Sequence, residues 1–263
     1  MSDRDTKTAW HADAVQEGAG GTVLVIDFST MSAERDAADV VKEAFPGRPV
    51  WRIDPVVALT AEASPLDLDQ MASRVERGLA EAGLEPELVV GYCSGTPLAM
   101  RVADRLDQGQ GVPLVLLAPG FPAWEHVESD LANILRTMGV PSATPPRLPR
   151  EAVSARAWVT TTVDDAIGIA IGALGLAEDE AAVLTGELAP RYKSWLGYLI
   201  SIVTAKIPAV ETDLCVIEMP EKWSRPDGGW PAHARFVDPG MTREELLESD
   251  LAPACVRRAE EIL

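Results

Sequence analysis

A motif around Cys93 combines a reactive side chain with a spacing that chemistry could use. Residues 89–96 read Val-Val-Gly-Tyr-Cys-Ser-Gly-Thr, a strand-like run that enters G-x-C-x-G and continues into helical spacing. This is the nucleophile-elbow pattern with cysteine at the serine position. Glycine is expected two residues before and after the nucleophile, because the turn holds its middle residue at positive φ and leaves no room for neighbouring side chains. The motif predicts Cys93 as a nucleophile, with a structural cysteine in a glycine-rich turn as the alternative.

Such a turn would also supply the groups that assist a reaction at Cys93. Its Sγ would lie at the N-terminus of the following helix, where the helix dipole and unpaired amides favour the thiolate. The backbone amide of Ser94 would donate to the oxyanion of a tetrahedral intermediate. A second donor is expected from the amide of Phe28 or Ser29, which follow an earlier strand-like run.

The elements around the motif predict a sheet that could position these groups. Runs rich in β-branched residues predict strands over 22–28, 50–53, 88–90, 112–117, 214–218 and 232–237. Apolar residues at three- and four-residue spacing predict helices over 32–45, 68–82, 96–106 and 242–263. Parallel neighbours need such long connections, whereas antiparallel neighbours do not. We therefore expect the α/β class, with a mostly parallel central sheet flanked by helices.

The strand pattern is interrupted in the second half of the chain. Residues 1–20 are polar and predict a flexible leader, and the core is expected over 21–122 and 211–263. Residues 123–210 predict an inserted helical lid, with helices packed on the same core as the alternative. If it is a lid, four apolar residues of a predicted helix over 192–205 should line an apolar pocket above the elbow. These are Trp195, Leu196, Leu199 and Ile200.

Composition excludes several classes of protein. The 263 residues are 47% hydrophobic with a formal net charge of −18, which argues against nucleic acid and anionic membrane surfaces as partners. No apolar run approaches a membrane span, and the start of the chain lacks the features of a signal peptide, so a cytoplasmic protein is expected. Three widely separated cysteines, Cys93, Cys215 and Cys255, predict neither a disulfide framework nor a metal site. No cofactor is expected.

With these features the chain resembles the α/β-hydrolases, and among them the type II thioesterases and thioesterase domains of polyketide and nonribosomal peptide biosynthesis. The residues that carry the resemblance are the apolar strand at 23–26, the elbow at 91–95 with Pro-Leu-Ala behind it, the strand end at 115–119, the lid-sized insertion, and the C-terminal strand and helix. The resemblance implies an enzyme that takes an acyl group from phosphopantetheine on an acyl or peptidyl carrier protein. The acceptor would be water or an internal nucleophile.

The resemblance also implies a histidine base and an acidic partner, and neither stands at its usual position. The segment 238–242, after the last strand, reads Asp-Pro-Gly-Met-Thr, and Ala118 stands where the acid often follows. His126, at the start of the insertion, is the preferred base candidate; the alternative is that His126 is an ordinary surface histidine. His11 falls in the leader, and His233 lies about 16 Å from the end of the strand where catalysis is expected. The acid candidates are Asp27, Glu218 and Glu221.

The missing base leaves three hypotheses. A thiol is a few per cent ionised at neutral pH, so acyl transfer through Cys93 is conceivable without histidine, and an amine is then a credible acceptor. The first hypothesis is therefore a thioesterase-like hydrolase or acyltransferase. The alternatives are a non-catalytic relative that binds an acyl carrier or small ligand, and a lyase or cyclase that uses the same pocket.

Overall fold

The computed structural model describes residues 10–28, 35–106, 112–140, 146–175, 177–207, 210–218, 226 and 229–263. It divides into two compact units. The sheet unit comprises Met1–Ala58, Leu66–Phe121 and Ile207–Leu263, and the helical unit comprises Leu59–Pro65 and Pro122–Lys206. The helical unit contains most of the residues expected to form a lid, and its role as a lid stays a prediction.

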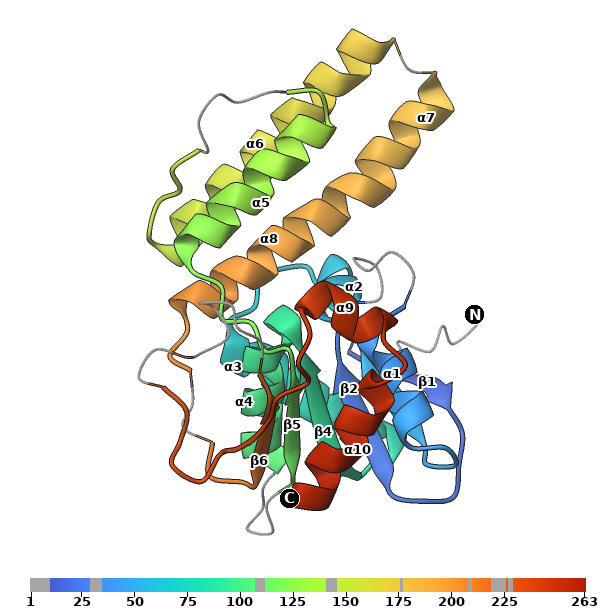
Figure 1. Ribbon diagram of the computed structural model, residues 1–263. Helices are drawn as coiled ribbons and strands as arrows, with labels where there is room; N and C mark the ends of the chain where they lie inside the picture. Colours follow the sequence, from blue (N-terminus) through green and yellow to red (C-terminus); the bar gives the residue numbers. More distant parts are fainter. Residues whose placement is uncertain are drawn as a thin grey trace. The chain divides into compact units, whose positions relative to one another are not determined.

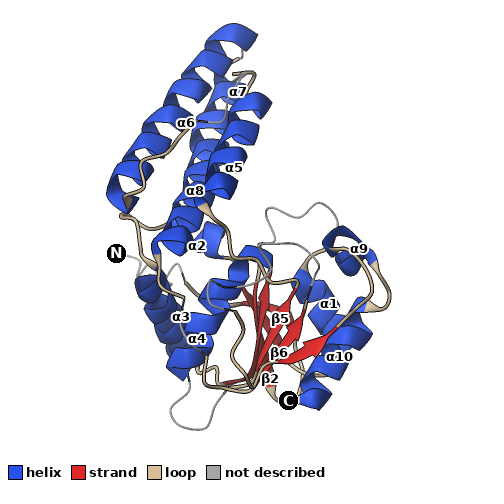
Figure 2. Ribbon diagram, turned by 60° about the vertical axis from the view of Figure 1, so that its left-hand side comes forward, coloured by secondary structure: helices blue, strands red, loops and turns tan. Residues whose placement is uncertain are grey.

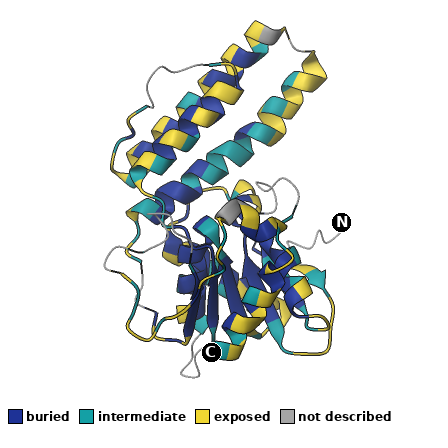
Figure 3. Ribbon diagram, in the orientation of Figure 1, coloured by how far each residue is buried: buried dark blue, intermediate teal, exposed yellow. Residues whose placement is uncertain are grey.

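The described part of the sheet unit contains a seven-stranded sheet in the order β1-β3-β2-β4-β5-β6-β7 (Figures 1 and 2). All neighbouring strands are parallel except β1 and β3. The strands are β1 (Asp13–Gln16), β2 (Thr22–Ile26), β3 (Val50–Ile53), β4 (Pro86–Tyr92), β5 (Leu114–Leu117), β6 (Leu214–Ile217) and β7 (Arg235–Val237). The central strands are apolar and buried on both faces, as Figure 3 shows in dark blue. The predicted α/β class is confirmed.

Helices cover both faces of the sheet (Figures 1 and 2). On one face, α1 (Ala37–Ala44) and α10 (Ala252–Ile262) share an apolar core with alternate residues of β2, β4, β5 and β6. On the other face lie α3 (Leu68–Ala82) and α4 (Thr96–Leu106), which have the predicted bounds. Two short helices are α9 (Arg243–Glu248), in this unit, and α2 (Pro55–Thr60), whose last two residues belong to the helical unit. Because β2, β4, β5 and β6 are parallel, their C-terminal ends lie at one edge of the sheet.

The structure corrects the expected leader. Residues 13–16 form β1, which pairs with β3, and Trp10 is 1% exposed. The Gln16 side chain donates to the carbonyl oxygens of Phe45 and Arg48 at 2.9 and 2.8 Å. The expectation is therefore wrong from residue 10 onward, because an edge strand needs no continuous apolar run to join a sheet. Residues 1–9 lie outside the described part of the chain.

The helical unit is built from α5 (Trp124–Thr137), α6 (Ala152–Leu174), α7 (Glu178–Val183) and α8 (Ala189–Thr204), with a π-helical turn at Leu184–Leu188. Trp195 on α8 donates from Nε1 to Asp130 Oδ2 on α5 at 3.0 Å, which joins the two helices. Leu196, Leu199 and Ile200 are at most 1% exposed. Among the described residues of the chain, no helix combines the length and apolar character needed to span a membrane.

Candidate active site

The elbow predicted from the sequence is present between β4 and α4. Strand β4 ends at Tyr92, a 3-10 turn covers Cys93–Gly95, and α4 begins at Thr96. In the described residues the two non-glycine residues with positive φ are Cys93 (49°) and Ala118 (45°). A side chain in this left-handed region is strained, and such residues gather at functional sites. Cys93, which is half-buried, therefore has the backbone conformation that the motif requires.

Close packing explains both glycines of the motif. A methyl group at Gly91 would lie 2.5 Å from Ala99 Cβ on α4. A methyl group at Gly95 would lie 2.7 Å from the carbonyl oxygen of Ile26, at the end of β2. Both distances are too short for any side chain, so the turn is pressed against α4 on one side and β2 on the other.

The expected oxyanion donors lie at the edge of the sheet where the elbow ends. Ser94 is 5% exposed, and its Oγ lies 3.9 Å from Cys93 Sγ. Phe28 is 6% exposed and follows β2, whose Ile26 pairs in register with Gly91 of β4. Ser29 lies outside the described residues. Donation from the Ser94 and Phe28 amides to one oxyanion stays a prediction.

Strand register brings Cys93, Ala118 and Glu218 into one row. Tyr92 pairs with Leu117, and Leu117 pairs with Ile217, so the next residue of each strand lies at the same level. With neighbouring strands about 4.8 Å apart, the backbones of Cys93 and Glu218 are about 10 Å apart. Ala118 stands between them in this row; it is completely buried and belongs to the apolar core. The Gly120 amide, which donates to the Cys93 carbonyl oxygen at 2.9 Å, ties the end of β5 to the elbow.

Two of the histidines lie in the sheet unit, away from the elbow. His11 precedes β1, which stands three strand positions from β4, about 14 Å across the sheet. His233 lies before β7 rather than inside the predicted strand 232–237, and its Nε2 is 3.2 Å from the Thr212 carbonyl oxygen. It therefore lies at the N-terminal end of the strand, opposite the end that carries Cys93.

His126 lies in the helical unit and has a structural partner. Its Nδ1 accepts a hydrogen bond from the Ala123 amide at 3.0 Å, closing the first turn of α5. A neutral imidazole that accepts at Nδ1 carries its proton on Nε2. To act as a general base at either ring nitrogen, His126 would have to release the Ala123 amide. A catalytic role for His126 therefore stays a prediction that requires a change at this bond.

Asp27, one of the acid candidates, is completely buried. Its Oδ2 accepts from the Ala38 amide on α1 at 3.0 Å, and its Oδ1 has no hydrogen-bond partner among the described residues. Burial, followed by the charges of Asp36 and Asp54, raises the pKa of Asp27 to about 7 against the opposing effects of the Ala38 bond and Arg52. The Asp27 side chain therefore joins the end of β2 to the first turn of α1. Glu221, the third acid candidate, lies outside the described residues.

The other two thiols are unsuited to nucleophilic chemistry. Burial raises the pKa of Cys215 to about 11, and it raises the pKa of Cys255 as well. Both thiols therefore stay protonated at neutral pH. Within the described ranges, no group of three or more His, Cys, Asp or Glu side chains could hold a metal ion.

Comparison with solved structures identifies the fold. A crystal structure of the NocB thioesterase domain, in covalent complex with a fluorophosphonate nocardicin G analogue, has a TM-score of 0.55 at 16% identity and covers 95% of this chain and 99% of that one. An α/β-hydrolase fold protein from Nakamurella multipartita has a TM-score of 0.50 at 18% identity over 95% and 94% of the two chains.

A third similar structure is much longer than this chain. The four-domain nonribosomal peptide synthetase AB3403, bound to AMP and glycine, matches with a TM-score of 0.57 at 15% identity and covers 95% of this chain. This chain spans 20% of its length. No protein-family model matches the sequence, and a search of curated proteins gave no match. The chain therefore has the α/β-hydrolase fold, with cysteine at the elbow.

Proposed function

We propose that this chain is a thioesterase-like enzyme of natural-product biosynthesis, which takes an acyl group from a carrier-protein thioester onto Cys93. The observation that carries the proposal is the backbone of Cys93, at φ 49° in the turn before α4, between two glycines at which a methyl group would meet Ala99 and the Ile26 carbonyl oxygen. The surrounding structure must enforce such a conformation, since it is costly for a cysteine. The thioesterase domain and the peptide synthetase among the similar structures support the substrate class.

The proposed acylation step uses the thiolate of Cys93. Its sulfur attacks the carbonyl carbon of the thioester, and the carbonyl electron pair moves to oxygen, where the Ser94 and Phe28 amides donate to it. Collapse of this intermediate breaks the bond to the phosphopantetheine sulfur, which leaves as a thiolate and takes a proton from solvent. The products are acyl-Cys93, itself a thioester, and the free thiol of the carrier.

The proposed deacylation step favours an amine over water. A neutral amine attacks a thioester without prior deprotonation, whereas water needs a general base. In the sheet unit, the described histidines lie away from the elbow, and the pairing of β4, β5 and β6 supports Glu218 as the acidic candidate. We therefore assign Glu218 as the group that accepts the proton released during deacylation.

The helical unit is proposed to select the acyl group. Its helix α8 carries the four residues that the sequence predicts as an apolar lining, Trp195, Leu196, Leu199 and Ile200. Leu196, Leu199 and Ile200 are at most 1% exposed, so they would contact an acyl chain only after the helices of this unit move apart. Burial of an octanoyl chain in place of acetyl would remove about 150 Å² of apolar surface from water, which is worth roughly 4 kcal/mol. Octanoyl thioesters should therefore be preferred strongly over acetyl thioesters.

Release of the pantetheine thiol tests the proposal. Acetyl, octanoyl and aminoacyl pantetheine thioesters are incubated with the protein, with and without a primary amine, and the free thiol is measured by chromatography. We expect release that is faster with octanoyl than with acetyl, faster with amine than without, and lost in Cys93→Ala. The Cys215→Ala variant is the matched control and should retain the activity. Release at the same rate in Cys93→Ala would refute the role of this thiol.

A further inference from the structure

The segment 26–28, which we call the exit of strand β2, is packed directly against the elbow. Ile26, the last residue of β2, pairs with Gly91, and its carbonyl oxygen fills the space that a side chain on Gly95 would need. The Phe28 amide follows two residues later. Since protein interiors transmit small displacements, any movement of this exit changes the position of the Phe28 amide relative to Cys93.

Asp27 attaches this exit to two other elements. Its backbone amide donates to the Ile53 carbonyl oxygen at the end of β3 at 3.3 Å. Its side chain, which is 0% exposed, accepts from the Ala38 amide in the first turn of α1 at 3.0 Å. A completely buried carboxyl group is costly. Asp27 follows Val23 and Val25 at two-residue spacing, on the face of the strand that these two residues bury in the apolar core. A merely apolar contact with α1 would not fix the exit in one place.

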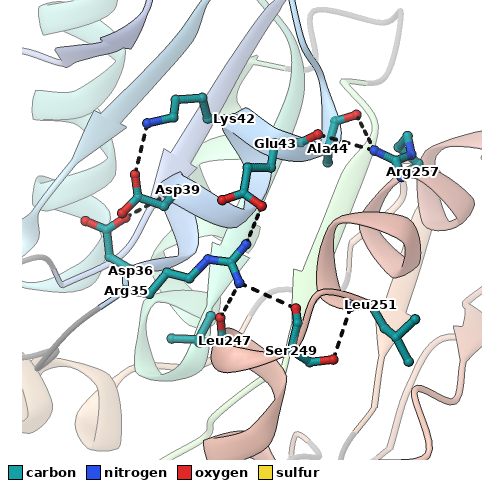
Figure 4. A network of polar contacts seen from close by, with 10 residues as sticks. All are labelled: Arg35, Asp36, Asp39, Lys42, Glu43, Ala44, Leu247, Ser249, Leu251 and Arg257. Atoms are coloured by element: carbon teal, nitrogen blue, oxygen red, sulfur yellow. Dashed lines mark hydrogen bonds and ion pairs between the residues drawn. The ribbon is translucent and has the colours of Figure 1, made fainter.

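The first turn of α1 is itself held in place. The Asp36 carboxylate caps the helix by accepting from the Asp39 amide at 2.9 Å, and it accepts from Arg52 Nη1 on β3 at 2.6 Å. Arg35 donates from Nη1 to the Leu247 carbonyl oxygen on α9 at 2.8 Å, as Figure 4 shows. The turn that Asp27 bonds is therefore anchored to β3 and α9.

Charge around Asp27 gives an experimental handle on its role. The charged groups that act on it are Asp36 at the cap of α1, Arg52 on β3 and Asp54 at the end of β3. Burial and the two carboxylates outweigh the single guanidinium, which raises the pKa of Asp27 to about 7. Near neutral pH the group is partly protonated, and the neutral form resembles an asparagine side chain in shape and charge.

We propose that Asp27 is a positioning residue for the thiol site: by bonding the first turn of α1, it fixes the exit of β2, and with it the Phe28 amide, against the elbow. Asp27 does not touch the substrate. The inference rests on the proposed function in one respect, because it gives the Phe28 amide the role of an oxyanion donor.

Two reactions of Cys93 separate this role from general support of the fold. Acylation by octanoyl-pantetheine forms an oxyanion, whereas alkylation by iodoacetamide does not. We expect Asp27→Ala to slow acylation about 100-fold, as loss of an oxyanion donor does, and to leave alkylation within about twofold. Asp27→Asn keeps an acceptor for the Ala38 amide and should acylate like the parent protein at pH 6.

The matched control is Asp54→Asn, which changes a second buried carboxylate at the same sheet edge and should leave acylation at pH 6 within about twofold of the parent protein. Equal slowing of acylation and alkylation in Asp27→Ala would show that Asp27 only supports the fold, and unchanged acylation would show that it positions nothing. Either result overturns the inference.

Hydrogen exchange tests the inference independently of the proposed function. If no thioester acylates the parent protein, the proposed function is refuted, but the exchange measurement still decides whether Asp27 positions the exit of β2. In the segment 24–28, Asp27→Ala should exchange at least tenfold faster than the parent, and Asp27→Asn should remain protected. Equal protection in all three proteins would overturn the positioning role.

Discussion

Replacing Asp27 by asparagine should stabilise the protein above neutral pH. The carboxyl is completely buried, and one of its oxygens has no hydrogen-bond partner among the described residues. At high pH the parent protein therefore carries a buried, poorly compensated charge. Asparagine has nearly the same shape, keeps an acceptor for the Ala38 amide, and carries no charge at any pH.

The magnitude follows from the difference in pKa between the two states. The pKa of Asp27 rises from 3.8 to about 7 on folding. Between these values the folded state binds more protons than the unfolded state, so the free energy of unfolding falls as pH rises and is lowest above pH 7. At about 1.4 kcal/mol per pH unit, the whole window is worth about 4 kcal/mol. Asp27→Asn has no such loss, so its advantage grows by about 3 kcal/mol between pH 5 and pH 8.

Urea unfolding of both proteins at half-unit steps from pH 5 to pH 8.5 measures this difference. All other titrating groups are common to the two proteins, so their effects cancel in the comparison. A difference in unfolding free energy that rises toward pH 7 and then levels off is the expected result. A difference that is constant with pH would show that Asp27 has an ordinary pKa, and the reasoning about its burial and charge would be refuted.

Four further substitutions test other parts of the structure. Gly95→Ala should destabilise the protein by about 1–3 kcal/mol and abolish the reactivity of Cys93, because the added methyl group would meet the backbone of Ile26. Its control, Gly168→Ala on an open face of α6, should stabilise the protein by about 0.5–1 kcal/mol. Equal effects of the two substitutions in urea unfolding would contradict the steric account. Trp10→Ala should cost about 3–5 kcal/mol, since Trp10 is 1% exposed, and a loss below 1 kcal/mol would show that the first described residues are held weakly. Glu218→Gln should slow deacylation about 100-fold without changing acylation in a single-turnover experiment, and an unchanged rate would remove Glu218 as the base.

Local patterns in the sequence were sufficient to predict the parallel sheet and the elbow. Apolar strands separated by amphipathic helices identify the fold class, and the bounds of α3 and α4 follow from their spacing and from Gly83, which ends α3 with φ 65°. The spacing of Gly91 and Gly95 around Cys93 reflects contacts within a short segment. A steric requirement of this kind is visible in any chain that meets it.

Features that depend on pairing between distant segments could not be predicted in this way. Strand β1 is polar and partly exposed, and only its register with β3 reveals it. The row of Cys93, Ala118 and Glu218 follows from strand register, as does the position of His233 before β7. Asp27 ends an apolar run in the sequence, and nothing local indicates that its carboxyl group is completely buried against α1.

Detection of an acyl group on Cys93 tests the central proposal most directly. The protein is mixed with octanoyl-pantetheine, quenched in acid within seconds, and analysed by intact mass and by peptide mapping, with Cys93→Ala and Cys215→Ala in parallel. The account predicts a mass increase of one octanoyl group, located on the peptide that contains Cys93, removed by hydroxylamine, present in Cys215→Ala and absent in Cys93→Ala. No adduct with octanoyl, acetyl or aminoacyl thioesters, or an adduct that persists in Cys93→Ala, would contradict it.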